Sequence, residues 1–506
     1  MMLPRPGVVA GVAAGAVAAA VLATSLLSPA PPAPVSSAAV VVTTKPIDSA
    51  DLVCPVPATT KGVSQATITA GAGAARPGTL SLYRLQGPLT AKPLAEVSAG
   101  ASTFGYLVPV GKATALVLRA TGGYAPGLAA KVTTTVSSGP ARSLQSVACS
   151  PAGDNAWYVG GGASVGRRSV LMLSNIDAAP ATVDVAVYTS AGMSQPTPVQ
   201  GVTVQPRSEL SFALDQLVPG AVATAVHVST SSGRVASALV DNQVNGLEPL
   251  GADWVPATAA AGLSAVLTGI PGDADAKTTL SLVVPGADAA VVNVHLVTTQ
   301  GTLSPGPLQA LTAAAGKLTS VTIPTALAAG PYAVVVEADR PVVAGIRTVR
   351  PAGHAGAHPD FSYAAAADPM ASPLVLAAVA HTLANGTVLQ LTAPGDRDVA
   401  VAVTTTTLAA PATAKSGPVP AGQPVTVRVT VTAGTTVRVV LGPLGSTLST
   451  VLVQTAAGAA PLYVGWVLEQ YDVHGPLVTG GPVPQTALTV VLPAVAADPA
   501  AGFPGH

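Results

Sequence analysis

Aromatic and charged residues are scarce in this sequence. Only 3% of its 506 residues are aromatic and 9% are charged, and the formal net charge is zero. Without an excess of Lys and Arg, the chain lacks the electrostatic footprint that binding to a phosphate backbone requires. The composition therefore argues against a nucleic-acid partner. The 3 tryptophans are also too few for the stacking platforms of a dedicated sugar-binding module.

Cysteine is nearly absent as well. The two cysteines, Cys54 and Cys149, exclude a zinc site built from four thiolates. In an exported chain such a pair predicts a disulfide, which closes a loop of about 95 residues and stabilises the fold by roughly 4 to 5 kcal/mol in the chain-entropy model. The rival reading, a lipid attached to Cys54, is weak because Val53 stands where a small residue would be wanted.

Long apolar runs are missing beyond the N-terminus, where Pro, Gly or a charge interrupts every run before the roughly 20 residues of a membrane span. At the N-terminus, Arg5 precedes an uncharged run from Gly7 to Leu27 and then a Pro/Ala/Ser stretch. This order is typical of a signal peptide or an uncleaved signal anchor. We therefore expect residues 1–27 to direct export, residues 28–50 to form a linker, and the body to be secreted or anchored to the cytoplasmic membrane.

What the chain does have is Ala, Val, Leu and Thr punctuated by 51 Gly and 47 Pro, a mixture that favours many short strands. A Thr/Ser-led strand recurs as "TLSLYRLQG" from Thr79, "SVLMLSNID" from Ser169, "TLSLVVPGAD" from Thr279 and "TVLQLTAPGD" from Thr387. Spacing of roughly 90 to 110 residues suits a sandwich of about seven strands. We predict an all-β fold of about four immunoglobulin-like β-sandwich units, with these boundaries: unit 1 at 51–150, unit 2 at 151–252, unit 3 at 253–352, a linker at 353–362, unit 4 at 363–492 and a flexible tail at 493–506.

Further patterns recur within the units. Strands that alternate apolar and polar residues are expected around 183–187, 292–296 and 399–403. A hairpin is expected late in each unit, from Thr114, Thr224, Tyr332 and Leu462. We interpret Trp157 and Trp254 as equivalent positions that open units 2 and 3.

The export segment, "DLVCPVP" around Cys54, "AWYVGGG" soon after the second cysteine, "SVLMLSN" and "GLEPLGADWVPAT" together resemble a family of secreted or anchored actinobacterial envelope proteins of unknown function. The resemblance covers roughly residues 51–490. It implies an extracytoplasmic protein of β-sandwich-like units, with no assigned activity and no catalytic residues to transfer.

The stretch "GASVG" from Gly162 to Gly166 matches the nucleophile-elbow pattern and would make Ser164 the nucleophile of a hydrolase. A β-run follows it instead of the helix that a nucleophile elbow requires, and this argues against a hydrolase. The same glycines, with Arg167 and Arg168, are a weak candidate for an anion-binding loop. A plain turn before a strand is the simpler interpretation.

Metal sites are poorly supported. His354 and His358 have helical metal-ligand spacing, with Asp360 as a third ligand, but Pro and Gly make their segment a loop. Asp273 with Asp275, and Asp396 with Asp398, are spaced like calcium ligands but lack the rest of a calcium loop. We therefore predict no metal, no cofactor and no catalytic residue.

The expected function is that of an exported, non-enzymatic scaffold of the cell envelope, which binds envelope proteins or wall polysaccharide. A polysaccharide- or peptidoglycan-binding module is the alternative, favoured if Trp157, Trp254 or Trp466 is exposed beside a polar groove and disfavoured if all three are buried. A hydrolase using Ser164 is the second alternative.

Overall fold

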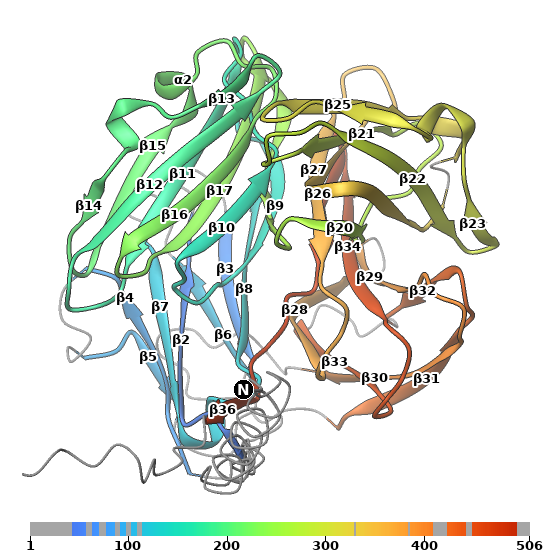
Figure 1. The fold of residues 1–506 in the computed structure, drawn as a ribbon. Coiled ribbons are helices and arrows are strands. Elements are labelled where there is room, and N and C mark those ends of the chain that lie inside the picture. Colours follow the sequence, from blue (N-terminus) through green and yellow to red (C-terminus); the bar gives the residue numbers. More distant parts are fainter. Residues whose placement is uncertain are drawn as a thin grey trace, which may run out of the picture. The chain divides into compact units, whose positions relative to one another are not determined.

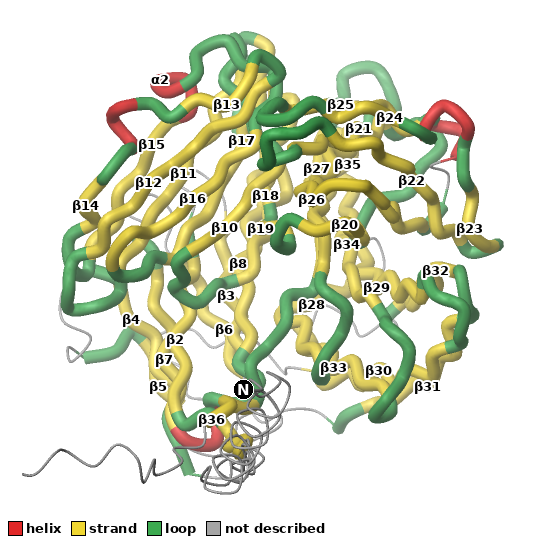
Figure 2. The backbone as a smooth tube through the Cα atoms, in the orientation of Figure 1, coloured by secondary structure: helices red, strands yellow, loops and turns green. Residues whose placement is uncertain are grey.

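The computed structural model describes residues 43–56, 63–69, 77–86, 92–97, 103–108, 114–327, 330–382, 385–407, 423–441 and 448–492. The expected export segment 1–27, most of the linker 28–50 and the tail 493–506 lie outside these residues. In the described ranges no helix is long and apolar enough to cross a membrane. The fold is almost entirely β, as predicted (Figures 1 and 2).

Contacts divide the chain into two compact units. One comprises residues 1–45 and 491–506, where the structure describes parts of two paired strands, β1 (Thr43–Pro46) and β36 (Thr489–Leu492). The other comprises residues 46–490 and holds the other described strands.

One scheme of strand pairing recurs four times in residues 46–490. Each repeat has eight strand positions, which we name a to h in chain order. In one sheet, strands a and c flank f, and d pairs with c; in the other, strands e and g flank b, and h pairs with g. Apolar residues from both sheets form the core of each repeat, for example in repeats 1 and 2.

The strands of repeats 1 and 2 occupy positions a to h in order. Repeat 1 contains β2 (Ser49–Cys54), β3 (Val63–Thr69), β4 (Leu80–Arg84), β5 (Ala95–Val97), β6 (Thr103–Val108), β7 (Leu116–Thr121), β8 (Ala129–Val136) and β9 (Ser143–Ala148), with the 3-10 helix η1 (Gly122–Tyr124). Repeat 2 contains β10 (Asn155–Val159), β11 (Arg167–Asn175), β12 (Ala181–Thr189), β13 (Gly192–Ser194) and β14 (Val202–Val204) at d, β15 (Ser208–Ala213), β16 (Ala225–Ser232), β17 (Ala236–Asn245) and β18 (Glu248–Val255), with η2 (Thr197–Val199), α2 (Leu214–Leu217) and β19 (Ala257–Thr258).

Repeats 3 and 4 follow the same order. Repeat 3 contains β20 (Gly262–Leu267), β21 (Lys277–Val283), β22 (Ala290–Thr298), β23 (Gly301–Leu303) and β24 (Leu311–Ala313) at d, β25 (Leu318–Ile323), β26 (Tyr332–Arg350) at both f and g, and β27 (Asp360–Ala367), with η3 (Gly306–Leu308) and η4 (Thr325–Leu327). Repeat 4 contains β28 (Leu374–Thr382), β29 (Asn385–Ala393), β30 (Val399–Thr407), β31 (Val425–Val431), β32 (Thr435–Val440), β33 (Leu448–Thr455), β34 (Tyr463–Asp472) and β35 (Gly475–Pro482).

The alternating strands predicted in three of the units are confirmed. They are the c strands β12, β22 and β30, whose alternate apolar residues are at most 2% exposed. The Thr/Ser-led strands are also real, but they are not all equivalent. The strand from Thr79 is β4 at position c, whereas those from Ser169, Thr279 and Thr387 belong to b strands. The b strand of repeat 1 is β3, whose sequence "VSQATIT" lacks the shared motif.

The expectation of a hairpin late in each unit is wrong for the first three. Strands β7 and β8, and likewise β16 and β17, lie in different sheets and do not pair with each other. In repeat 3 the two runs form one long strand, β26, whose first half pairs with β20 and β22 and whose second half pairs with β21 and β27. Each run has its own buried face, so apolar alternation is the same for a hairpin as for a chain that crosses between sheets. Of the four predicted hairpins, the one in repeat 4 is present, formed by β34 and β35.

Two interpretations at the unit boundaries are also wrong. Trp157 lies on β10 and Trp254 on β18, so the two tryptophans occupy positions a and h of the same repeat. The predicted boundaries at 252/253 and 362/363 cut through β18 and β27, which pair with β17 and β26 of their own repeats. Both interpretations fail because the sequence pattern does not reveal strand h, the last strand of each repeat.

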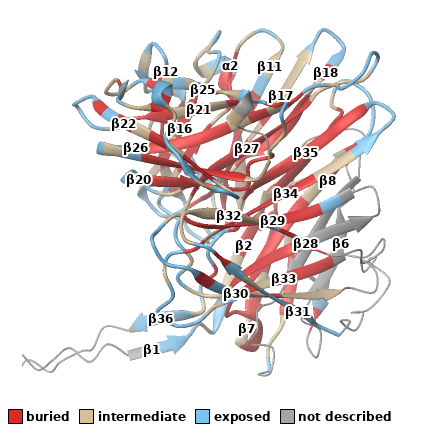
Figure 3. Ribbon diagram, turned by 90° about the vertical axis from the view of Figure 1, so that its right-hand side faces the viewer, coloured by how far each residue is buried: buried red, intermediate tan, exposed pale blue. Residues whose placement is uncertain are grey.

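The four h strands meet at one place. Strand β9 packs against β18, β18 against β27, β27 against β35, and β35 against β9. Strands β27 and β35 are buried along nearly their whole length (Figure 3). We call this meeting of β9, β18, β27 and β35 the junction of the repeats.

Candidate functional site at the junction of the repeats

Two buried carboxylates tie the junction together. Asp360 on β27 accepts hydrogen bonds from the backbone N–H groups of Leu144 at 3.2 Å and Val478 at 2.9 Å. Leu144 lies on β9 and Val478 on β35. Among the described strands β9 pairs only with β8 and β35 only with β34, so their other edges present N–H groups that need acceptors. Asp360 thus joins repeat 3 to repeats 1 and 4.

Asp253 on β18 has the same role from repeat 2. Its carboxylate accepts the Ser146 N–H at 3.2 Å, the Thr479 hydroxyl at 3.0 Å and the Tyr363 N–H at 3.4 Å. Burial raises the pKa of Asp360 to about 8 and raises that of Asp253, although the donated N–H bonds oppose both shifts. These two carboxyl groups therefore keep their protons at pH values at which ordinary aspartates are ionised.

A guanidinium closes the junction between the first and last repeats. Arg142, 1% exposed, donates to the carbonyl oxygens of Pro476 at 3.1 Å and Gly475 at 2.8 Å. It also pairs with the Asp472 carboxylate at 2.8 Å. The g–h connections of repeats 1 and 4 are therefore held to each other.

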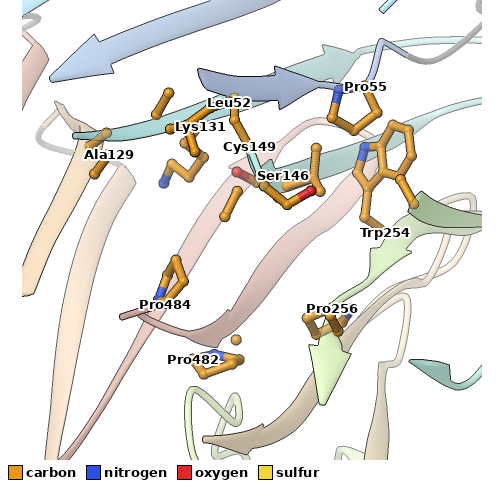
Figure 4. Close-up of a pocket in the computed structure, with 18 of the residues that line it drawn as sticks. Leu52, Pro55, Ala129, Lys131, Ser146, Cys149, Trp254, Pro256, Pro482 and Pro484 are labelled. Carbon is orange, nitrogen blue, oxygen red and sulfur yellow. The ribbon is translucent and has the colours of Figure 1, made fainter. Parts of the chain in front are cut away.

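Beside the junction lies a cavity of about 190 Å³ (Figure 4). Its walls come from repeats 1, 2 and 4 and are mainly apolar, and they include Leu52, Leu128, Val147, Trp254, Pro256, Val375, Trp466 and Pro482. Figure 4 places Lys131 and Trp254 on opposite sides of the pocket. Lys131 is the one charged residue among the described residues that line it.

Lys131 is 3% exposed, and its Nζ has no hydrogen-bond partner in the described part of the chain. It reaches this position because alternate residues of β8 face opposite ways: Val132 enters the core of repeat 1, and Lys131 points away from it. Its Nζ lies 3.6 Å from the ring centroid of Trp466 in repeat 4, a cation–π contact. Burial lowers the pKa of Lys131 to about 7.

A second donor in the cavity wall is also unpartnered. The indole Nε1 of Trp254 is buried without an acceptor among the described residues. The Tyr158 hydroxyl, by contrast, donates to the Ser237 carbonyl at 2.6 Å. The site therefore offers two hydrogen-bond donors, one of them cationic, in apolar surroundings.

The predicted pair Arg167 and Arg168 does not form one anion site. The two residues point to opposite faces of β11, and Arg168 is exposed. Arg167 is paired with buried Asp241, with Nη2 to Oδ2 at 2.8 Å, and it also donates to the Tyr363 hydroxyl at 2.6 Å. Burial alone would lower the pKa of Arg167, but Tyr363 and Asp241 together raise it above its usual value.

The Gly-rich loop before β11 serves this network. The N–H of Gly161 donates to the Tyr363 hydroxyl, and the N–H of Gly162 donates to the Ser169 hydroxyl, which in turn donates to Asp241. Gly161 adopts a φ of 84°, a conformation that favours glycine. The loop therefore binds Tyr363 of repeat 3 directly, and Tyr363 and Ser169 both donate to the Asp241 carboxylate of repeat 2. A carboxylate of the protein itself thus occupies the place that an external anion was predicted to take.

Ser164 lies in the turn between β10 and β11, so no helix follows it. Its carbonyl oxygen accepts the Arg167 N–H, and no hydrogen bond from its side chain to a titratable group is found in the described residues. The strand–turn–helix geometry of a nucleophile elbow is not formed.

The predicted metal ligands are dispersed. His354 is exposed, the N–H of His358 donates to the His474 carbonyl, and Asp360 points into the junction instead. Asp273 forms an ion pair with Arg350, and Asp398 accepts the Ala433 N–H. The described residues contain no group of three or more His, Cys, Asp or Glu side chains arranged for a metal ion.

The predicted disulfide between Cys54 and Cys149 is confirmed. Cys54 ends strand a of repeat 1, and Cys149 directly follows strand h. The bond therefore connects the two sheets of repeat 1 next to the cavity, which Cys149 also lines.

The three tryptophans are buried, with exposures of 7% for Trp157, 2% for Trp254 and 4% for Trp466. Trp157 stacks on His227 with ring centroids 4.1 Å apart. None of the three presents the open aromatic face on which a sugar ring stacks. This arrangement disfavours the polysaccharide-binding alternative.

A comparison with protein-family models matches residues 108–442 to "Family of unknown function (DUF5719)". The match includes all of repeats 2 and 3 and parts of repeats 1 and 4. It confirms the resemblance to an uncharacterised family. A comparison with curated proteins gave no match.

Proposed function

The chain belongs to the DUF5719 family, and we propose that this member acts outside the cytoplasm as a rigid, non-catalytic scaffold of four immunoglobulin-like β-sandwiches. The observation that carries the proposal is the junction, where buried carboxylates of one repeat accept N–H bonds from strands of the others. A scaffold needs a fixed spacing between its binding surfaces, and such cross-links resist hinge motion between repeats.

Contacts between every neighbouring pair of repeats support a single rigid body. Across each of these pairs, one polar side chain that is at most 3% exposed makes a hydrogen bond for which water does not compete. The side chains are Asp253 between repeats 1 and 2, Tyr363 between 2 and 3, Gln390 between 3 and 4, and Arg142 between 1 and 4.

The location outside the cytoplasm rests on two features. A disulfide such as Cys54–Cys149 persists in oxidising compartments and is rare where thiols are kept reduced. The uncharged run from Gly7 to Leu27 after Arg5 has the order of an export segment. Partners of the scaffold are envelope proteins or wall polymer, bound through loops and sheet edges.

The proposal is tested in cells that produce the protein. Acid-quenched cells are fractionated and treated with a maleimide before and after reduction, and the N-terminus of the envelope-bound protein is read by mass spectrometry. We expect Cys54 and Cys149 to react only after reduction and the protein to remain with the envelope. Reactive thiols together with a cytosolic location would overturn the extracytoplasmic role.

The scaffold role itself needs a second measurement. Cross-linking in the intact envelope, followed by purification, should repeatedly recover the same protein or polymer joined to this chain. Recovery of the chain alone, without any adduct, over a range of cross-linker lengths would contradict a scaffold.

A further inference from the structure

The lysine in the cavity beside the junction lacks a counter-charge. Lys131 is 3% exposed, and no carboxylate is found among the described residues that line the cavity. An ammonium group taken out of water is costly unless an anion or several acceptors replace its hydration. Trp466 supplies a π-face at 3.6 Å but no acceptor atom. The site therefore has an unmet demand for one negative charge.

The surrounding walls restrict what brings that charge. The cavity is mainly apolar, and its volume is about 190 Å³. A dry cavity of about 150 Å³ accommodates benzene, so a body of about six carbons fits here. A phosphate dianion would place a second negative charge against apolar walls with a single cation to balance it. A monoanion joined to a small apolar body meets both conditions.

We propose that this cavity binds a small monocarboxylate with an apolar body, whose carboxylate pairs with the Lys131 ammonium. The apolar body lies against the Leu, Val and Pro side chains of repeats 1, 2 and 4. The Trp254 indole N–H is a further donor in the wall. The site does not depend on the scaffold role, and it holds whatever the partners of the protein are.

Few other groups titrate near Lys131. Tyr158, which lines the cavity, stays neutral because burial raises its pKa to about 12. Of the strands packed against β8, β2 carries Asp51, which is paired with Arg119, and β28 carries His381, whose side chain lies outside the described residues. β3 and β9 carry no titratable side chain.

The test is calorimetric titration of the purified chain with hexanoate and, as a matched neutral probe, hexanol. We expect hexanoate to bind more tightly than hexanol at pH 6. Because the carboxylate binds the ammonium form, complex formation at pH 8 must take up a proton, and the Kd should rise about tenfold per pH unit above the pKa of Lys131. Titrations in two buffers of different ionisation enthalpy measure that proton.

Two variants separate the contribution of the Lys131 charge from that of the apolar cavity. Lys131→Met keeps an unbranched side chain only one heavy atom shorter and removes its charge, so it should bind hexanoate at least about tenfold more weakly while hexanol binding remains. Lys317→Met, at an exposed position in repeat 3, should match the parent chain. The proposal is overturned if hexanoate binds no better than hexanol, if Lys131→Met keeps the preference for hexanoate, or if the folded parent chain binds no hexanoate at millimolar concentration.

Discussion

Arg167 and Lys131 are two buried cations with opposite surroundings. Arg167 meets the Asp241 carboxylate and the Tyr363 hydroxyl, and every member of its network accepts or donates within the protein. Lys131 meets apolar walls and one aromatic ring. The first arrangement is complete without a ligand and holds repeats 2 and 3 together. The second is incomplete, which marks it as a place where another molecule binds.

Removal of the partner should break the complete arrangement most severely. Asp241→Ala leaves the Arg167 charge buried and unpaired and deprives the Ser169 and Tyr363 hydroxyls of their acceptor. We expect a loss of about 3 to 5 kcal/mol in the free energy of unfolding, measured by denaturant titration. A loss below about 1 kcal/mol would show that Asp241 is not the group that compensates this charge.

The junction carboxylates should make stability depend on pH. The pKa of Asp360 is about 8 in the folded protein and about 3.9 in an unfolded chain, so the folded state holds the extra proton between these values. The free energy of unfolding should therefore fall as pH rises from about 4 to 8, by up to about 1.4 kcal/mol per pH unit. Asp360→Asn imitates the neutral acid and should flatten this slope. An exposed control, Asp398→Asn, should leave the slope unchanged, and an unaltered slope in Asp360→Asn would refute the assignment.

Lys131→Met should act in the opposite direction from Asp241→Ala. The pKa of Lys131 is about 7 in the folded protein, below the usual lysine value of about 10.4. The buried amine therefore lowers the free energy of unfolding mainly at pH values at which it is charged. We expect the variant to be more stable by about 1 to 3 kcal/mol at pH 6, with the gain vanishing near pH 10. Thermal unfolding at both pH values checks this, and a destabilised variant at pH 6 would mean that Lys131 has a partner.

An exposed ion pair gives the smallest effect and the reference for the others. Arg234 and Asp177 pair at 2.8 Å, but their side chains are 52% and 35% exposed. Arg234→Ala should therefore cost less than about 1 kcal/mol, and salt should reduce that cost further. A salt-insensitive loss of several kcal/mol would remove the contrast between exposed and buried pairs on which the comparison depends.

The parts of the fold that follow from local pattern were predictable. The c strands alternate valine with polar residues, and the two cysteines leave a single pairing. Repeats 2 and 3 also share a detail at matching positions: Gln200 and Gln309 donate to the carbonyls of Val185 and Val294. These features depend on neighbours in the sequence or on one long-range partner.

The h strands were missed because they are buried on both faces and so do not alternate. Their Gly, Pro and Asp residues, as in "EPLGADWV" and "GPLVTGGP", resemble linkers. Lys131 was missed for a related reason. In "AAKVTTTV" it occupies the outward face of a strand, which normally meets water, and the sequence does not reveal that repeat 4 covers that face. The sequence gives one signal for these buried polar residues: each is a single aspartate or lysine in a segment that is otherwise apolar or made of small residues.

The contact of Arg142 with Asp472 spans 330 residues of chain. A chain made or exported from its N-terminus has β9 and the wall around Lys131 in place long before β34 and β35 exist. Until then, the guanidinium of Arg142 has no acceptor from repeat 4, and apolar side chains that later line the cavity remain open to solvent. Contacts of such sequence separation close late and slowly. Chains that end before residue 482 should therefore be the species most prone to aggregate or to be captured by chaperones.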